Sequence, residues 1–161
     1  YAFNPHTDGD NYRLHVTSIR FDEPSCCALL DRSFVAVSIH GCESYRPNII
    51  LGGRNVLLKS ILAEELGRLE HRVMEHPRFA GVHRKNIVNR PLLHGVQLEL
   101  TDLLRAELFD DFTDPAGRRL NAAGWALARA IRGGLARYRR RALQASSNGS
   151  PTTRHVVTAG G

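Results

Sequence analysis

His40 has the strongest case for chemistry in this sequence of 161 residues. It ends the near-continuous apolar run SFVAVSIH (33–40) and is followed at once by Gly41, a pattern typical of a strand buried on both faces. Ligands of open α/β sheets bind beyond the carboxyl ends of the strands, so an imidazole there is a candidate metal ligand or general base. The alternative is a core histidine whose ring is satisfied by a backbone carbonyl.

His40 and Glu43 also have the spacing His-x-x-Glu. This spacing can offer an imidazole and a carboxylate to one zinc ion and leave a coordination position for water. It is common by chance, so the pair alone is weak evidence for a metal site. Cys42 lies two residues from His40, but we expect a buried structural thiol at that position.

Glu99 is the second candidate, because it interrupts an alternating apolar strand. In VQLEL (96–100) the apolar residues share one face, while Gln97 and Glu99 share the other. A carboxylate on a covered face must be paired, lie near a metal or have a raised pKa. Those are the conditions of a general base, and the alternative is a solvent-facing strand carboxylate.

Asn89 and Arg90 place an amide beside a guanidinium after the short segment NIVNR (86–90), which we expect to be extended. Arg90 can form two parallel hydrogen bonds to a substrate carboxylate or stabilise a developing oxyanion. An ordinary salt bridge is the alternative.

The elements that must position these residues alternate between strands and helices. We predict a loop over 21–27 and over 73–85, a short helix from Thr101 or Asp102 to Phe109, and a long helix from Asn121 to about Gln144 that is interrupted at Gly133 and Gly134. The predicted strands are 14–21, 33–40, 48–53 and 96–100, and an amphipathic helix is predicted over 55–72. This order favours an α/β layer architecture.

Composition limits the class of protein. Hydrophobic residues make up 42% of the chain and charged residues 24%, which is ordinary for a globular protein. No apolar run approaches the roughly 20 residues that a membrane span needs. Cys26 and Cys27 are adjacent and only three cysteines are present, so we expect no disulfide framework and a reducing, cytoplasmic location.

Positive charge is concentrated at the C-terminal end. From Arg118 onward there are nine arginines and no acidic residue, whereas residues 1–117 carry 13 basic and 16 acidic side chains. Such a segment can bind a polyanion such as nucleic acid. The alternative is a solvated helix face.

Five motifs together resemble the poly-γ-glutamate hydrolase family, which is known from bacteriophages and bacteria and has some members labelled phage-related replication protein. The motifs are RLHVTSIRFDEP (13–24), VSIHG (37–41), LGGRN (51–55), NIVNR (86–90) and GVQLEL (95–100). They occur in the expected order within about residues 12–140, and as a set they are specific.

The resemblance implies a zinc-carboxypeptidase-like α/β fold with three layers, in which helices flank a mixed sheet. It implies hydrolysis of γ-glutamyl amide bonds with one zinc ion held by two histidines and a glutamate. By this resemblance His40 is a zinc ligand, Glu99 is the general base and acid, and Asn89 and Arg90 bind the substrate. Zinc would lower the pKa of its bound water, and Glu99 would take the proton.

One family feature is absent from the sequence. The other two metal ligands of the family lie in an upstream segment of the form His-x-Gly-Gly-x-Glu, which this chain lacks. We therefore expect an N-terminally truncated domain over 1–144 without its first strand, a disordered tail over 145–161, and no activity of this chain by itself. Recruitment of Glu43 as a ligand is an alternative to truncation.

The expected partner is poly-γ-glutamate or a similar polyanionic peptide, with no membrane partner. The alternative function is that of a catalytically inactive homologue, in which the basic C-terminal helix binds nucleic acid or another polyanion.

Overall fold

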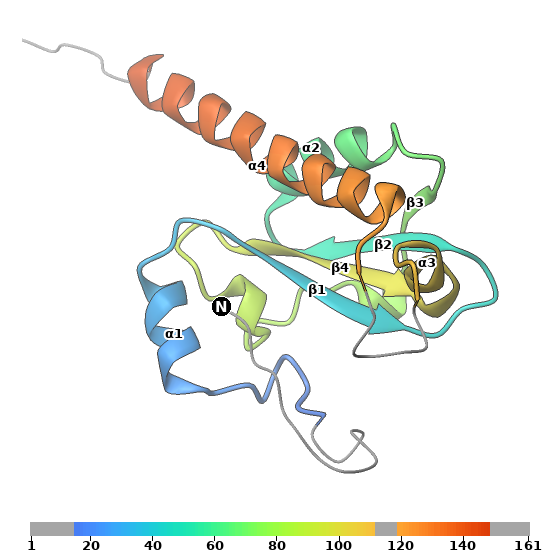
Figure 1. Cartoon of the computed structure of the whole chain (residues 1–161). Coiled ribbons are helices and arrows are strands. Elements are labelled where there is room, and N and C mark those ends of the chain that lie inside the picture. The colour runs from blue at the N-terminus through green and yellow to red at the C-terminus, as the bar shows by residue number, and fades with distance from the viewer. Residues whose placement is uncertain (1–14, 112–118, 149–161) are drawn as a thin grey trace, which may run out of the picture.

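A mixed four-stranded sheet forms the centre of the protein. The computed structural model describes residues 15–111 and 119–148 (Figure 1). The sheet has the strand order β1-β4-β2-β3, where β4 is parallel to β1 and antiparallel to β2, and β2 is parallel to β3. The strands are β1 (Ala36–Cys42), β2 (Asn48–Gly53), β3 (Arg72–Glu75) and β4 (Gly95–Thr101). The expected α/β class is confirmed.

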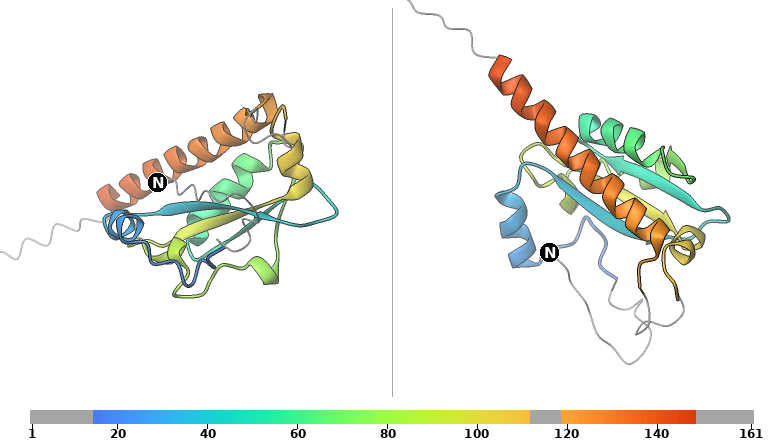
Figure 2. Two further views of the ribbon diagram at one scale, coloured as in Figure 1. Left: turned by 60° about the horizontal axis from the view of Figure 1, so that its bottom comes forward. Right: turned by 45° about the horizontal axis from the view of Figure 1, so that its top comes forward.

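Helices flank this sheet. They are α1 (Pro24–Asp31), α2 (Val56–Leu66), α3 (Asp102–Glu107) and α4 (Ala122–Asn148), with two 3-10 turns, η2 (Pro77–Phe79) and η3 (Ile87–Asn89). Figure 2 shows α2 and α4 together over one face of the sheet, with the segment that contains η2 and η3 on the opposite side. None of the described helices is both long enough and apolar enough to cross a bilayer.

The hydrophobic core lies between the sheet and the two helices α2 and α4. Apolar side chains of β2 and β4 alternate toward the helices, as period-two strands require. Its fully or almost fully buried members include Ile49, Leu51, Val96, Leu98, Leu58, Ile61, Leu62 and Leu66. The opposite face of β4 is therefore left with the polar residues of the strand.

The long C-terminal helix is continuous, so the predicted interruption at its two glycines is wrong. Gly134 is buried, and a Cβ atom there would lie 2.6 Å from Cδ2 of Leu62. The missing side chain allows α4 to approach α2 closely. The helix also runs on to Asn148, so residues 145–148 are helical, and the rest of the predicted tail lies outside the described residues.

Two predictions near the start of the described chain are wrong, one about the loop over 21–27 and one about the strand over 14–21. The predicted loop over 21–27 contains the start of α1, where Pro24 occupies the first turn and the Glu23 carboxylate accepts hydrogen bonds from the backbone of Ser25 and Cys26. The strand predicted over 14–21 is irregular in its described part, which ends in a turn. The Ser18 carbonyl there accepts a hydrogen bond of 2.8 Å from the backbone of Ile87 instead of joining the sheet.

Three further segments differ from the prediction. Helix α2 ends at Leu66 because Gly67 caps it, well before residue 72. The predicted loop over 73–85 contains β3, which pairs with β2 over four residues. The segment 86–90 is a 3-10 turn and not extended, because the Asn86 side chain caps it by accepting a hydrogen bond from the backbone of Val88.

Candidate functional site

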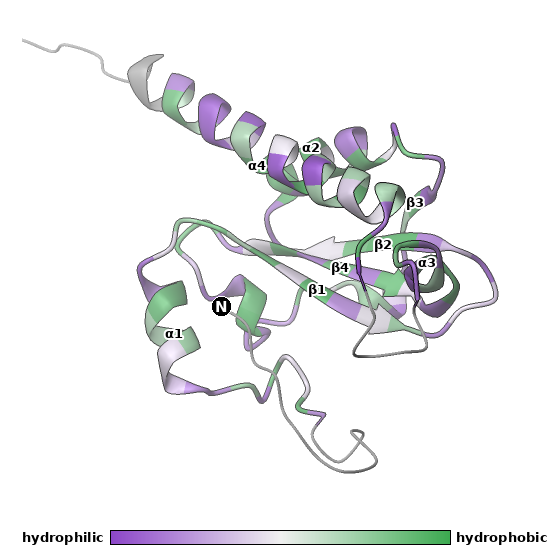
Figure 3. Ribbon diagram, in the orientation of Figure 1, coloured by the Kyte–Doolittle hydropathy of each residue, from purple (hydrophilic) through white to green (hydrophobic). Residues whose placement is uncertain are grey.

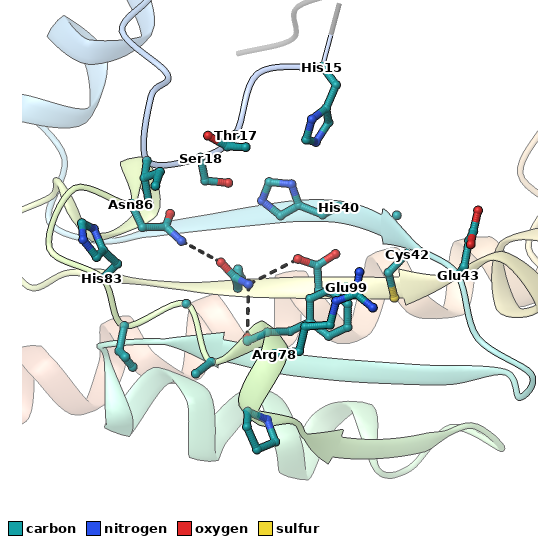
Figure 4. Close-up of a pocket in the computed structure, with 18 of the residues that line it drawn as sticks. His15, Thr17, Ser18, His40, Cys42, Glu43, Arg78, His83, Asn86 and Glu99 are labelled. Atoms are coloured by element: carbon teal, nitrogen blue, oxygen red, sulfur yellow. Dashed lines mark hydrogen bonds between the residues drawn. The ribbon is translucent and has the colours of Figure 1, made fainter. Parts of the chain in front are cut away.

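A wide pocket of about 960 Å³ opens on the polar face of β1 and β4. It is lined from four sides: the described N-terminal segment, the end of β1, the turn that contains η2, and the polar residues of β4 (Figure 4). Its titratable lining residues are His15, His40, Cys42, Glu43, Arg78, His83, Glu99 and Arg105. The sheet thus places several polar groups around one cavity.

His40 and Glu99 are direct neighbours in this pocket. The parallel pairing of β1 and β4 sets His40 opposite Glu99, and both residues line the cavity. Nε2 of His40 lies 3.1 Å from the Ser38 hydroxyl oxygen. Burial, and next the charge of nearby His15, lower the pKa of His40, which favours the neutral imidazole.

Glu99 is a buried carboxyl at the floor of the pocket. Only 8% of the residue is exposed, and burial raises the pKa of its carboxyl to about 7. A carboxyl with that pKa exchanges a proton near neutral pH, as a general base and acid must. The expectation of a carboxylate on a covered face is confirmed, and its catalytic role stays a prediction.

Two amides hold Glu99 in a hydrogen-bonded chain. Nε2 of Gln97 lies 3.3 Å from Oε1 of Glu99 and 3.2 Å from the carbonyl oxygen of Phe79, and it donates to both. Oε1 of Gln97 accepts a hydrogen bond of 2.8 Å from Nδ2 of Asn86. Gln97 was expected to share the face of Glu99, whereas no motif identifies Asn86 as its partner.

Asn89 and Arg90 do not line the pocket. Nδ2 of Asn89 donates to the backbone carbonyls of Gly81 and His83, and Oδ1 accepts from the backbone of Arg54. Arg90 forms two hydrogen bonds to Asp31, from Nε at 2.6 Å and from the terminal nitrogen at 2.8 Å. Their substrate-binding role therefore stays a prediction, and in this conformation Arg90 forms the salt bridge that was the alternative.

Two arginines do line the pocket, Arg78 and Arg105. Both lower the pKa of Cys42, against burial and Glu99, which raise it more. The four side chains are therefore close enough to interact through their charges. Nothing in the sequence distinguishes these two arginines from the others, because their position depends on η2 and α3 reaching the same cavity.

The described residues do not make a complete zinc site. Within residues 15–111 and 119–148 no group of three or more His, Cys, Asp or Glu side chains could hold a metal ion. Glu43 lines the pocket, but it does not complete a three-ligand group with His40 there. His40 is the one described residue among the ligands that the family resemblance implies.

The fold and the pocket define an α/β protein with a buried carboxyl beneath a wide polar cavity. The family model described as poly-gamma-glutamate hydrolase matches residues 1–126. The chain belongs to this family.

Solved structures share the fold. A bacteriophage poly-gamma-glutamate hydrolase superposes with a TM-score of 0.76 and is 34% identical, over 81% of this chain and 65% of that one. A zinc-free apo structure of YndL superposes with a TM-score of 0.72 and is 26% identical, over 80% of this chain and 66% of that one. The mixed sheet and its flanking helices are therefore those of the family.

Two curated relatives come from Bacillus subtilis strain 168. The SPbeta prophage-derived UPF0714 protein YoqZ is 33% identical over 62% of this chain, and the UPF0714 protein YndL is 30% identical over 70% of it. The chain spans 38% of the length of YoqZ and 46% of that of YndL. The shared sequence thus covers less than half of each relative.

Proposed function

We propose that the protein hydrolyses γ-glutamyl amide bonds and that Glu99 is its general base. The observation that carries this proposal is the Glu99 carboxyl, which is buried at the floor of a pocket of about 960 Å³ and has a pKa of about 7. The family match supports the substrate class, since the family model is described as poly-gamma-glutamate hydrolase.

The chemistry of Glu99 follows from its protonation state. Near pH 7 about half of these carboxyls are ionised, so Glu99 can take a proton from a water molecule that attacks the amide carbonyl. As the carbon–oxygen bond forms and the carbon–nitrogen bond breaks, the same carboxyl returns the proton to the leaving amine nitrogen. Gln97 orients the carboxyl through the hydrogen bond to its Oε1.

Zinc is the cofactor that the family resemblance implies. His40 is the described residue assigned to it, and its lowered pKa keeps the imidazole neutral, as a metal ligand must be. Asn89 and Arg90 are the substrate-binding residues that the resemblance implies, and for Arg90 this requires the ion pair with Asp31 to open.

A second candidate function is binding of nucleic acid or another polyanion along α4. Figure 3 shows hydrophilic and hydrophobic residues alternating along this helix. Arg137 is paired with Glu64 and Glu65, whereas no ion pair within the described part of the chain involves the other arginines of the helix. The exposed ones are Arg129, Arg132, Arg139, Arg140 and Arg141.

The two functions are separated by two measurements on the natural gene product that contains these 161 residues. Poly-γ-glutamate incubated with it in the presence of zinc should yield shorter γ-linked products, and poly-α-glutamate should not. No cleavage would contradict the hydrolase. DNA binding with an affinity that falls linearly in log salt supports the second function, and no binding at low salt rejects it.

A further inference from the structure

We infer that Arg78 and Arg105 form a carboxylate-binding subsite beside Glu99, which holds the α-carboxylate of a γ-linked glutamate unit. This inference rests on the proposed function, because it concerns how the same pocket recognises its substrate. It replaces neither Glu99 nor His40, and it assigns the binding of the substrate carboxylate to residues outside the recognised motifs.

Arg78 is positioned by the turn that contains η2. Its side chain is exposed and lines the pocket, and its guanidinium carbon lies 5.4 Å from the centre of the Phe79 ring. Figure 4 shows Arg78 on the same side of the cavity as Glu99 and Cys42. No ion pair to Arg78 occurs within residues 15–111 and 119–148. Its charge is therefore available to a ligand.

Arg105 reaches the pocket from α3 by crossing the end of β1. A Cβ atom on Gly41 would lie 2.8 Å from Cζ of Arg105, so the guanidinium lies directly against the backbone of that glycine. Gly41 follows His40 and pairs with Leu100, the residue after Glu99. The absence of a side chain at Gly41 thus leaves room for Arg105 at the end of β1, where it lines the same pocket as His40 and Glu99.

A γ-linked chain carries a free carboxylate close to each amide bond. In such a chain the carbon atom bonded to each amide nitrogen also carries a free carboxylate. In an α-linked chain the free carboxylate lies two methylene groups further from that carbon. A base that acts on the γ-linked amide therefore has a carboxylate within a few bonds of the reacting atoms, and arginine is well suited to bind it.

Arg90 cannot serve this carboxylate in the same conformation. It does not line the pocket, and its guanidinium is engaged by both carboxylate oxygens of Asp31. A substrate would have to break this two-point ion pair before it could bind Arg90. Arg78 has no ion pair within the described residues that a substrate would first have to break.

The test compares the binding of two probes of equal charge, γ-linked and α-linked tetraglutamate, to the 161-residue chain by calorimetry at low salt. We expect the γ-linked probe to bind more tightly. Arg78→Gln should weaken its binding about 10-fold or more, because a charge-assisted hydrogen bond is lost, and should reduce the preference for the γ-linkage. Arg78→Lys should restore part of the affinity for the γ-linked probe. Arg105→Gln should weaken the binding of this probe without changing the melting temperature of the protein.

Arg84→Gln is the matched control, because Arg84 is exposed in the same segment but does not line the pocket. Equal losses in Arg78→Gln and Arg84→Gln, or no binding preference for the γ-linked probe, would overturn the inference. A loss confined to Arg90→Gln would overturn it too. If Arg78→Gln weakens binding while the gene product cleaves no polymer, the subsite stands and the hydrolase falls.

Discussion

Gln97 donates a hydrogen bond from Nε2 to Oε1 of Glu99, two residues further along the same face of β4, at 3.3 Å. The orientation of the Gln97 amide is fixed at its other end, where Oε1 accepts from Nδ2 of Asn86 at 2.8 Å. The amide nitrogen must therefore face the carboxyl. It favours the ionised form of Glu99, against the burial that raises its pKa.

Replacement of Gln97 should shift Glu99 toward its protonated form. In Gln97→Leu the donor to Glu99 is lost, so the pKa of Glu99 should rise above its wild-type value of about 7. NMR titration of the side-chain carboxyl carbon of Glu99 measures this directly. An unchanged pKa in the variant would contradict the role of Gln97, and a wild-type pKa near 4.5 would contradict the effect of burial.

Glu99 should also make stability depend on pH. Its pKa is raised from 4.5 to about 7, so between these values the unfolded chain loses this proton before the folded protein does. The free energy of unfolding should fall as the pH rises through this window, by about 3.5 kcal/mol at most, since one pKa unit corresponds to about 1.4 kcal/mol.

Glu99→Gln removes this titration and keeps the shape of the side chain. Relative to the wild type, the variant should gain stability between pH 4.5 and 8. Urea unfolding at several pH values measures the difference. If the free energies of unfolding of the two proteins run parallel over that range, burial does not raise the pKa of Glu99 in the folded protein.

The two adjacent glycines of α4 should respond oppositely to substitution. A Cβ on Gly133 has only Glu65 near it, at 4.0 Å, so Gly133→Ala should stabilise the helix by about 0.5 to 1 kcal/mol. A Cβ on Gly134 would lie 2.6 Å from Leu62, so Gly134→Ala should gain nothing or destabilise. Thermal unfolding of the two variants compares them, and equal stabilisation would show that α4 does not pack closely on α2.

Three of the four strands and the polar face of the site could be predicted from sequence, whereas β3 was missed and the strand expected over 14–21 is wrong. The apolar runs that form β1, β2 and β4 are strong signals, and the alternation in β4 placed Gln97 and Glu99 on one face. Of the two residues at which α3 was predicted to begin, Thr101 is its cap, since its side chain accepts a hydrogen bond from the backbone of Leu104.

The remaining elements depend on tertiary contacts or on weak local signals. β3 has only four residues, with no fully buried side chain, so its pattern resembles a loop. Pro24 is compatible both with a loop and with the first turn of a helix, and the Glu23 cap decides between them. Arg78 and Arg105 enter the site through the packing of turns against the sheet, which no local pattern reports.

Zinc binding to the 161-residue chain should be weak. Among the described residues His40 has no two further ligand side chains around it, and a stable zinc site needs at least three protein ligands. Calorimetric titration with zinc should therefore show no tight one-to-one binding. Tight binding that is lost in His40→Ala would contradict this prediction and would show that the chain completes a zinc site itself.

The central claim is that Glu99 is the general base of a γ-glutamyl hydrolase. Its most direct test is the rate of poly-γ-glutamate cleavage by the natural gene product and by its Glu99→Gln variant, with Glu64→Gln as a control on the helical side of the sheet. We predict that Glu99→Gln lowers the rate by about a thousandfold or more and leaves the protein folded, with a melting temperature no lower than that of the wild type, while the control keeps its activity. Near-normal cleavage by a folded Glu99→Gln protein would contradict the claim.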